Sequence, residues 1–275
     1  MSIAFVNATV LTLDDAASVR TDCDVLIRDG RIAALGPGAA DGVDVRRIDG
    51  RALVLMPGLI NAHTHSPENL SKGRDEASQL DAWRQRTWGD LDALTPRAIH
   101  VATLLGAGQM LRSGATTVVD HFRQTPMRAA ALDAVVDAYE SSGMRAIIAP
   151  MLRDRVVPAG RTMPSVTDQV ALIENTIGRS DRSERIKIGF GPSAPYRCSD
   201  ELFLAVADAA RRTGAVVHCH VDESRAEADE ARAFYGRSSV QQLAQLGVLG
   251  PSCSIAHAVH VDTADIEMIA STGTV

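Results

Sequence analysis

The sequence predicts an α/β protein: a parallel (β/α)8 barrel, C-terminally truncated in this chain, with a small β-sandwich domain begun by the N-terminal strands. Three observations predict it. Residues 1–56 contain only short strand-like runs, and from Pro57 onward strand-like and helix-like segments alternate. The alternation stops mid-unit after about 220 residues, whereas an eight-stranded barrel takes about 250. We therefore expect two domains, at 1–56 and 57–275, the second incomplete.

The first 56 residues are predicted to form strands of the small β-domain. The runs AFVNATVLTL, DVLIRDGRIAALG and RRIDGRALVLM are rich in β-branched and apolar residues, and Asp29-Gly30 marks a tight turn. Because these few strands form only an incomplete sheet, we expect this segment to pair with strands elsewhere in the protein.

Six strand–helix units follow. The predicted strands span 59–65, 115–121, 145–151, 185–192, 215–221 and 253–261. The predicted helices span 96–112, 128–142, 166–177, 200–213, a segment opened by Ser224, and 263–271. Residues 66–94 are predicted to be a long polar loop, and Thr274-Val275 look like the start of a seventh strand. Such alternation is typical of parallel strands covered by helices.

Composition excludes several classes of function. The net charge is −6 with no basic stripe, which argues against nucleic acid as a partner. No apolar run is long enough to cross a membrane, and the N-terminus lacks the basic start of a secretory signal. The four cysteines lie far apart without a C-x-x-C pair, so we expect neither disulfides nor a thiolate zinc site. A cytoplasmic location fits this pattern.

The histidines are the strongest local signal. Seven of the eight fall at the ends of predicted strands, and only His100 lies in a helix. In a parallel barrel these strand ends form the rim that carries the active site. His63 and His65 are two residues apart on one strand, so both imidazoles point to the same side and can share one ion.

The segment H-C-H-V-D-E at 218–223 adds His220 near the strand exit. Ser224 and Glu227 are predicted to form a capping box for the next helix, which leaves Glu223 just outside it and free to face the site. The alternative is that Glu223 is only a first-turn acid favoured by the helix dipole. His218, one layer deeper, is predicted to be a hydrogen-bonded core residue.

Three further residues are placed by their position on strands. His257, near the end of its strand, should reach the barrel interior, whereas His260 begins the next connection and is predicted to be structural. Lys187 begins its strand and should lie at the opposite rim, so we exclude it from the site.

Together these stretches resemble the amidohydrolase superfamily, in the branch of triazine hydrolases and S-adenosylhomocysteine/methylthioadenosine deaminases. The matching segments run in order along nearly the whole chain: MPGLINAHTHSPENLSKG, the Trp83 region, SGATTVVDH, GFGPSAPYRCS, HCHVDES and AHAVH. The resemblance implies that His63, His65 and His220 bind one divalent metal, usually zinc, with Fe²⁺ as an alternative. It also implies that Glu223 shuttles protons and that His257 orients the nucleophile or polarises the substrate.

The resemblance also implies a fourth metal ligand, and this chain departs from the family pattern at one position. The family's fourth ligand is an Asp on the eighth strand, which this sequence does not reach, so residues 1–275 alone are expected to bind metal poorly. Adenosine-type deaminases carry His-Ser after the proline of the fourth strand, where this chain has Ser193-Ala194. That departure weakens a purine nucleoside assignment and leaves the substrate open.

The resulting hypothesis is a deaminase: metal-activated water replaces an amino group on a small N-heterocycle and releases ammonia or an amine. His121, Trp83, Gln79 and Ser193 are candidate substrate-binding residues, and a homo-oligomer is expected. Hydrolysis of a cyclic amide or of a carbon–halogen bond is the alternative chemistry, because the fold cannot choose between them. An inactive metal-binding fragment is the non-enzymatic alternative.

Overall fold

The structure is a computed structural model that describes residues 2–75, 77–157, 160–179 and 183–275. Internal contacts divide the chain into two compact units, Met1–Leu59 and Ile60–Val275. The sequence-based boundary falls after residue 56, three residues earlier. Each unit is described by itself below.

The first unit is a mixed sheet ordered β3-β2-β1-β4, with β5 also paired to β1. The β1–β2 and β2–β3 pairs are antiparallel, and β4 and β5 run parallel to β1. Its strands are β1 Ile3–Leu11, β2 Val19–Arg28, β3 Arg31–Gly36, β4 Arg46–Asp49 and β5 Val54–Leu55. Successive residues of a strand face opposite sides. Accordingly, Val25 packs with Ala8 and Val10, whereas Leu26 packs with Ala4 and Ala40. The sheet therefore buries small apolar clusters on both faces.

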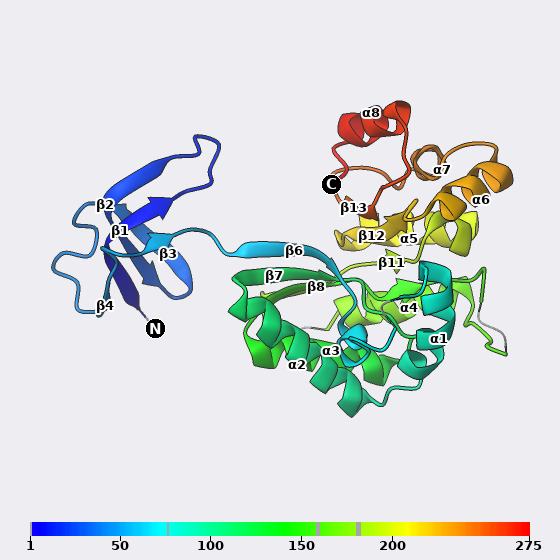
Figure 1. The fold of residues 1–275 in the computed structure, drawn as a ribbon, viewed down its shortest axis with the longest axis horizontal. Helices are drawn as coiled ribbons and strands as arrows, with labels where there is room; N and C mark the ends of the chain where they lie inside the picture. The colour runs from blue at the N-terminus through cyan, green and yellow to red at the C-terminus, as the bar shows by residue number, and fades with distance from the viewer. Residues whose placement is uncertain (1, 76, 158–159, 180–182) are drawn as a thin grey trace. The chain divides into compact units, whose positions relative to one another are not determined.

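The second unit contains parallel strands surrounded by helices (Figure 1). The strands are β6 Leu59–Thr64, β7 Ala115–Asp120, β8 Arg145–Ile148, β9 Met151–Leu152, β10 Ile186–Ile188, β11 Gly191–Pro192, β12 Val217–Val221 and β13 Cys253–His257. β8 with β9, and β10 with β11, are each one barrel strand interrupted for two residues. A bridge from Phe190 to Val217 joins β10–β11 to β12. Six successive barrel strands result, which confirms the predicted α/β fold.

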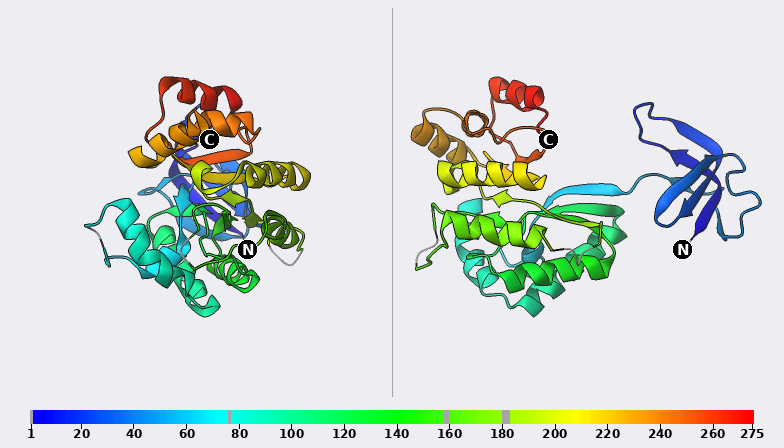
Figure 2. Two further views of the ribbon diagram at one scale, coloured as in Figure 1. Left: turned by 90° about the vertical axis from the view of Figure 1, so that its right-hand side faces the viewer. Right: turned by 180° about the vertical axis from the view of Figure 1, so that it is seen from behind.

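The helices lie outside these strands, as the views in Figure 2 show. They are η1 Ser66–Leu70, α1 Leu80–Asp92, α2 Pro96–Arg112, α3 Ala129–Ser142, α4 Val166–Ile177, η2 Pro195–Arg197, α5 Asp200–Thr213, α6 Arg225–Tyr235, α7 Ser239–Gln245 and α8 Thr263–Thr272. Local signals set their ends: in α5 the Ser199 hydroxyl accepts the Leu202 N–H, and Gly214 closes the helix at φ 70°. One large apolar core fills the space between strands and helices.

The prediction that residues 66–94 form a long loop was wrong. This stretch contains η1 and the 13-residue helix α1. Arg84 on α1 is buried and forms ion pairs with Glu223 and Glu227, and Trp88 is partly buried among arginines. Tertiary ion pairs and aromatic contacts, rather than an apolar stripe, hold this helix in place.

Candidate metal and substrate site

The strand alternation of β12 places its two histidines in the barrel interior. Val217, Cys219 and Val221 face the helices as part of the apolar core. His218 and His220, at the alternate positions, therefore face the barrel axis. There they meet β6, because the His63 ring centroid lies 5.1 Å from that of His218 and 5.0 Å from that of His220. Histidines of the first and fifth barrel strands therefore meet in the barrel interior.

The geometry of His65 and His220 leaves two lone pairs facing each other. His65 Nδ1 lies 2.7 Å from the His121 carbonyl oxygen, and His220 Nδ1 lies 2.7 Å from that of Ser193. A carbonyl only accepts, so each Nδ1 carries the proton and each Nε2 is a bare acceptor. The two Nε2 atoms nevertheless lie 3.2 Å apart. Nitrogens bound at about 2.0–2.1 Å to one tetrahedral ion lie about 3.3–3.4 Å apart, so this pair fits a shared cation.

His63 completes the group, since one donor atom from each of His63, His65 and His220 lies within 4.8 Å of the others. Burial, more than the neighbouring imidazoles, lowers the pKa of His63 to about 3. Burial also lowers the pKa of His65 to about 4 and that of His220 well below its usual value. All three are therefore neutral at pH 7, the state in which imidazole binds a metal. The donor set fits a divalent metal.

A deeper layer of histidines supports this group. His218 Nε2 lies 2.8 Å from His63 Nδ1, and His218 Nδ1 lies 2.9 Å from the Ser254 hydroxyl. His218 is thus hydrogen-bonded inside the barrel. His121 is fully buried, with its Nε2 3.1 Å from the Gly191 carbonyl oxygen. A side chain at Gly191 would come within 2.8 Å of the His121 ring, so glycine is needed there.

Glu223 and His257 lie at the mouth of the same group. His257 Nε2 is 3.7 Å from Glu223 Oε2, and its ring stacks on His220 with centroids 5.3 Å apart. By strand alternation His257 would share the outward side of Cys253. Its φ of 74° lies instead in the left-handed region, followed by Ala258 at 48°. This strained backbone at a strand end turns the imidazole towards the barrel axis.

The predicted capping box at Ser224 forms only in half. The Ser224 hydroxyl accepts the Glu227 N–H, but the Glu227 carboxylate does not return to the Ser224 backbone. It accepts the Glu223 N–H and receives hydrogen bonds from the side chains of Arg84, Tyr196 and Arg197. The arginines draw the carboxylate inward because a buried guanidinium needs an acceptor. Arg84 also pairs with Glu223, so one arginine holds both acids.

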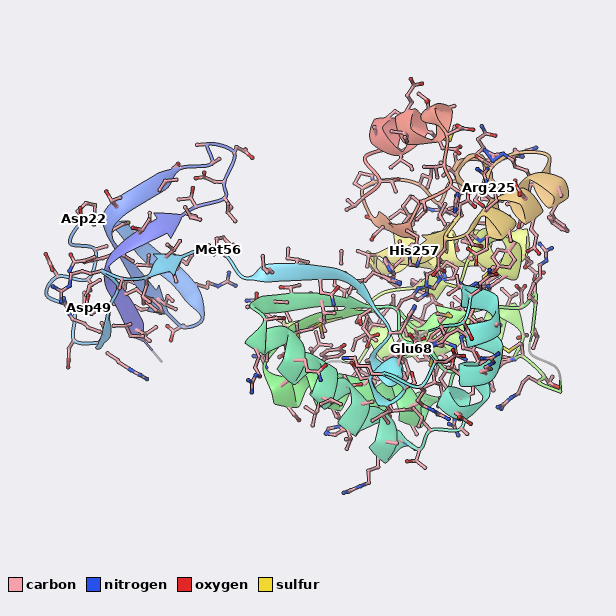
Figure 3. The ribbon with its side chains drawn as sticks, viewed as in Figure 1. Asp22, Asp49, Met56, Glu68, Arg225 and His257 are labelled. Carbon is pink, nitrogen blue, oxygen red and sulfur yellow. The ribbon has the colours of Figure 1, made fainter. Side chains whose placement is uncertain are left out.

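A cavity of about 350 Å³ opens beside the histidines. It is lined by His63, His65, Glu68, Leu80, Trp83, Arg84, Trp88, Arg123, Met151, Arg197, His220, Glu223 and His257. Glu68 and His257, labelled in Figure 3, reach it from elements far apart in the sequence. Burial raises the pKa of Glu68 to about 7. Acidic, basic and aromatic groups thus converge on one small space.

The candidate substrate-binding residues are placed differently from one another. Trp83 lines the cavity, whereas Gln79, Ser193 and His121 are not among its described lining residues. Gln79 is solvent-exposed and is the N-cap of α1. Ser193 is fully buried, and its carbonyl, rather than its hydroxyl, positions His220. Because Ser193 acts through its backbone carbonyl, the identity of its side chain could not have predicted this role.

Several residues of the site belong to no motif that could be recognised in the sequence. Asp120 is fully buried and accepts hydrogen bonds from the Ser66 N–H and the Tyr139 hydroxyl, which anchors the chain just after His65. Burial raises the Asp120 pKa to about 6. Arg123 and Trp88 are isolated residues in unremarkable contexts. Only Asp120, directly before a strand-end histidine, could have been found from its position.

Comparison with known proteins gives consistent results. Residues 54–274 match the family model described as the amidohydrolase family. The chain is 32% identical to a 5-methylthioadenosine/S-adenosylhomocysteine deaminase of Pelotomaculum thermopropionicum, over 98% of this chain and 60% of the relative. It is 32% identical to a 5'-deoxyadenosine deaminase of Methanosarcina mazei, over 97% of this chain and 60% of that relative. The chain thus spans about 60% of the length of these relatives.

Solved structures that share the fold include two with zinc. Atrazine chlorohydrolase from Arthrobacter aurescens TC1, complexed with zinc, superposes with a TM-score of 0.90 at 26% identity, covering 99% of this chain and 64% of the other. An adenosine deaminase from Xanthomonas campestris with bound zinc gives a TM-score of 0.87 at 27% identity, covering 99% of this chain and 61% of the other.

Within the described residues, no helix is long and apolar enough to span a membrane.

Proposed function

This chain belongs to the amidohydrolase family, and we propose that the protein containing it is a metal-dependent aminohydrolase. It replaces an amino group on a small N-heterocycle with oxygen and releases ammonia or an amine. The relatives named as deaminases support this assignment. The cavity of about 350 Å³ supports a small substrate, since it is at the lower end of the size of ligand pockets.

The observation that carries the proposal is the pair of facing Nε2 atoms on His65 and His220, 3.2 Å apart, with His63 beside them. Two unprotonated nitrogens at that distance repel each other unless a cation lies between them. We assign His63, His65 and His220 as ligands of one divalent ion, with zinc favoured by the zinc-bound structural neighbours. Zinc at this position would make water nucleophilic at neutral pH.

The protein's own groups then move the protons. Glu223 Oε1 or Oε2 takes a proton from the attacking water and delivers it to the leaving nitrogen. Arg84 holds this carboxylate in position from α1. His257, 3.7 Å from Glu223, orients the water or polarises the ring. Trp83 on the cavity wall offers a flat surface for the heterocycle.

The test is a metal and product assay on the whole protein. Zinc content is measured by elemental analysis, and ammonia release is followed with aminopurines, aminopyrimidines and aminotriazines. We expect about one zinc per chain and ammonia from at least one substrate, lost on chelation and restored by zinc. A fully zinc-loaded protein that releases ammonia from none of these substrates would contradict the proposal.

A second candidate is hydrolytic dehalogenation. It is favoured by the similarity to a structure named as an atrazine chlorohydrolase. The same activated water would then attack a ring carbon bearing chlorine, and Glu223 would not need to protonate the leaving group. Chlorinated and aminated rings compared side by side, with chloride and ammonia as readouts, distinguish the two. Hydrolysis of cyclic amides is scored in the same panel.

Domain division, location and assembly complete the proposal. We assign residues 1–56 to a small β-sandwich domain and 57–275 to the hydrolase barrel. We place the protein in the cytoplasm, supported by four free, buried cysteines. We propose a homo-oligomer, supported by the exposed apolar side chains of Val101 and Leu105 on α2. Light scattering of the whole protein tests the assembly.

A further inference from the structure

Four arginines surround one tryptophan beside the proposed metal site. The guanidinium carbons of Arg123 and Arg153 lie 4.5 and 4.8 Å from the Trp88 ring centroid. Those of Arg84 and Arg197 lie 5.9 and 5.5 Å from the same point. All four are buried, with exposed fractions between 1% and 6%. Such a concentration of buried positive charge requires partners.

The partners within the chain are too few. Arg84 and Arg197 are paired with Glu227, and Arg84 also with Glu223. Arg123 is paired with Asp92 at 3.2 Å. In the part of the chain that the structure describes, Arg153 forms no ion pair, and its side chain donates only to the Met151 sulfur at 3.3 Å. Four guanidiniums therefore meet three paired carboxylates.

Unmet hydrogen bonds occur at the same place. Nε and Nη1 of Arg123, and the same two atoms of Arg153, are buried without a hydrogen-bond partner. The face of the Trp88 ring attracts a cation, but it accepts no conventional hydrogen bond. Glu68 also lines the cavity, yet no ion pair joins it to any of these arginines among the described residues. Buried donors of this kind are costly unless a ligand supplies the acceptor.

We propose that the cavity contains an anion subsite and that the substrate is an amino-N-heterocycle bearing a carboxylate. The carboxylate binds Arg123, which lines the cavity, while the amino-bearing carbon lies at His63, His65 and His220. Arg153 does not line the cavity and acts through its positive field. A carboxylate accepts strong, charge-assisted hydrogen bonds from a guanidinium, and a small cavity favours it over a bulkier phosphate. This inference rests on the proposed aminohydrolase function.

The experiment compares matched substrates on the whole, zinc-loaded protein. Aminopyrimidines, aminopurines and aminotriazines are each assayed with and without a ring carboxylate, and with a phosphate in its place. We expect the carboxylate to raise kcat/KM by about 10–100-fold, as charge-assisted hydrogen bonds would. Arg123→Met should reduce that ratio to about one, and Arg123→Lys should leave part of it. Arg211→Met, on the exposed face of α5, should leave the ratio unchanged.

Binding without turnover separates this inference from the proposed function. Carboxylated rings that lack the amino group are titrated calorimetrically. If no substrate releases ammonia but these rings bind wild type at least tenfold more tightly than Arg123→Met, the subsite stands and the deaminase assignment fails. Equal ammonia release from neutral and carboxylated rings overturns the subsite alone. A tenfold preference for phosphate overturns the choice of carboxylate. If Arg123→Met is insoluble, the wild-type ratio decides, and Arg153→Met should lower that ratio only in part, because Arg153 does not line the cavity. An unchanged ratio in Arg153→Met together with a wild-type ratio of one overturns the subsite.

Discussion

In the second unit, the cavity at the amino ends of the barrel strands and the cavity at their carboxyl ends are lined by different kinds of residue. At the amino ends, a cavity of about 550 Å³ is lined by apolar residues such as Ile147 and Ile188 and by the charged residues Arg179, Glu184 and Lys187. At the carboxyl ends, a smaller cavity of about 350 Å³ is lined by histidines, acids and arginines. The larger cavity contains no histidine among the described residues.

We therefore infer the functional end from the chemistry of the lining residues rather than from the cavity volume. At the carboxyl ends, burial lowers the pKa values of His63, His65 and His220, and raises that of Glu68. Such shifts cost folding free energy and are characteristic of functional sites. Strained backbone at His257 adds to the cost. Changes at the amino ends should therefore affect function far less.

The largest expected effect comes from removing a ligand. His220→Ala in the whole protein should lose the bound metal and essentially all turnover, since it removes one of the two facing Nε2 atoms. The matched change at the other end, Lys187→Ala, should leave zinc content and kcat unchanged. Elemental analysis and steady-state kinetics measure both. Full zinc occupancy in His220→Ala would break the comparison between the two ends.

Removing the proton carrier should cost less than removing a ligand. Glu223→Gln preserves shape, so zinc should stay bound while kcat falls by about 10²–10⁴-fold. Glu227→Gln is a useful control, because that carboxylate is enclosed by arginines and does not line the cavity. It should reduce stability more than kcat measured at low temperature. Near-normal kcat in Glu223→Gln would make Glu223 only a helix-entry acid.

Acid should destabilise the metal-free protein through the same histidines. His63 and His65 have folded pKa values of about 3 and 4, below the usual 6.5, so the unfolded state binds their protons first. Their contribution to stability is present above pH 6.5 and is lost as pH falls through 4 for His65 and towards 3 for His63. Denaturant unfolding of the metal-free protein at pH 7.5 and 5.0 measures this. His63→Asn should flatten the pH dependence, and an unchanged slope would contradict the shift.

A buried ion pair at the carboxyl ends should matter more than an exposed one elsewhere. Asp92→Asn removes the ion-pair partner of Arg123, and leaving a buried charge unpaired costs roughly 3–5 kcal/mol. Asp208→Asn, in an exposed pair with Arg212 on α5, should cost no more than about 1 kcal/mol. Chemical denaturation of the whole protein compares the two variants. Equal losses would show that the arginine cluster is better solvated than the structure indicates.

The sequence predicted the parts of this site that depend on strand position. Histidines at strand ends must meet at one rim, and helix α2 begins and ends where Pro96 and Arg112 predicted. It did not predict α1, because that helix has no apolar stripe and is held by partners over 130 residues away, such as Glu223. Nor could it predict that Arg123 and Arg153 meet at Trp88. These contacts exist only after the chain has folded.

The smallest expected effect tests whether His257 is a metal ligand or an orienting residue. His257 reaches the site through a left-handed backbone conformation rather than through strand alternation, and its imidazole faces Glu223 at 3.7 Å. We therefore expect His257→Asn to keep full zinc occupancy and to lower kcat by about 10–100-fold, as loss of an orienting hydrogen bond does. His260→Asn is the matched control, because its backbone N–H donates to the Asp222 carbonyl and its imidazole forms no hydrogen bond with any residue that the structure describes. Zinc content and kcat are measured on the same preparations. Zinc loss in His257→Asn equal to that in His220→Ala would make His257 a ligand and extend the metal site to the sixth barrel strand.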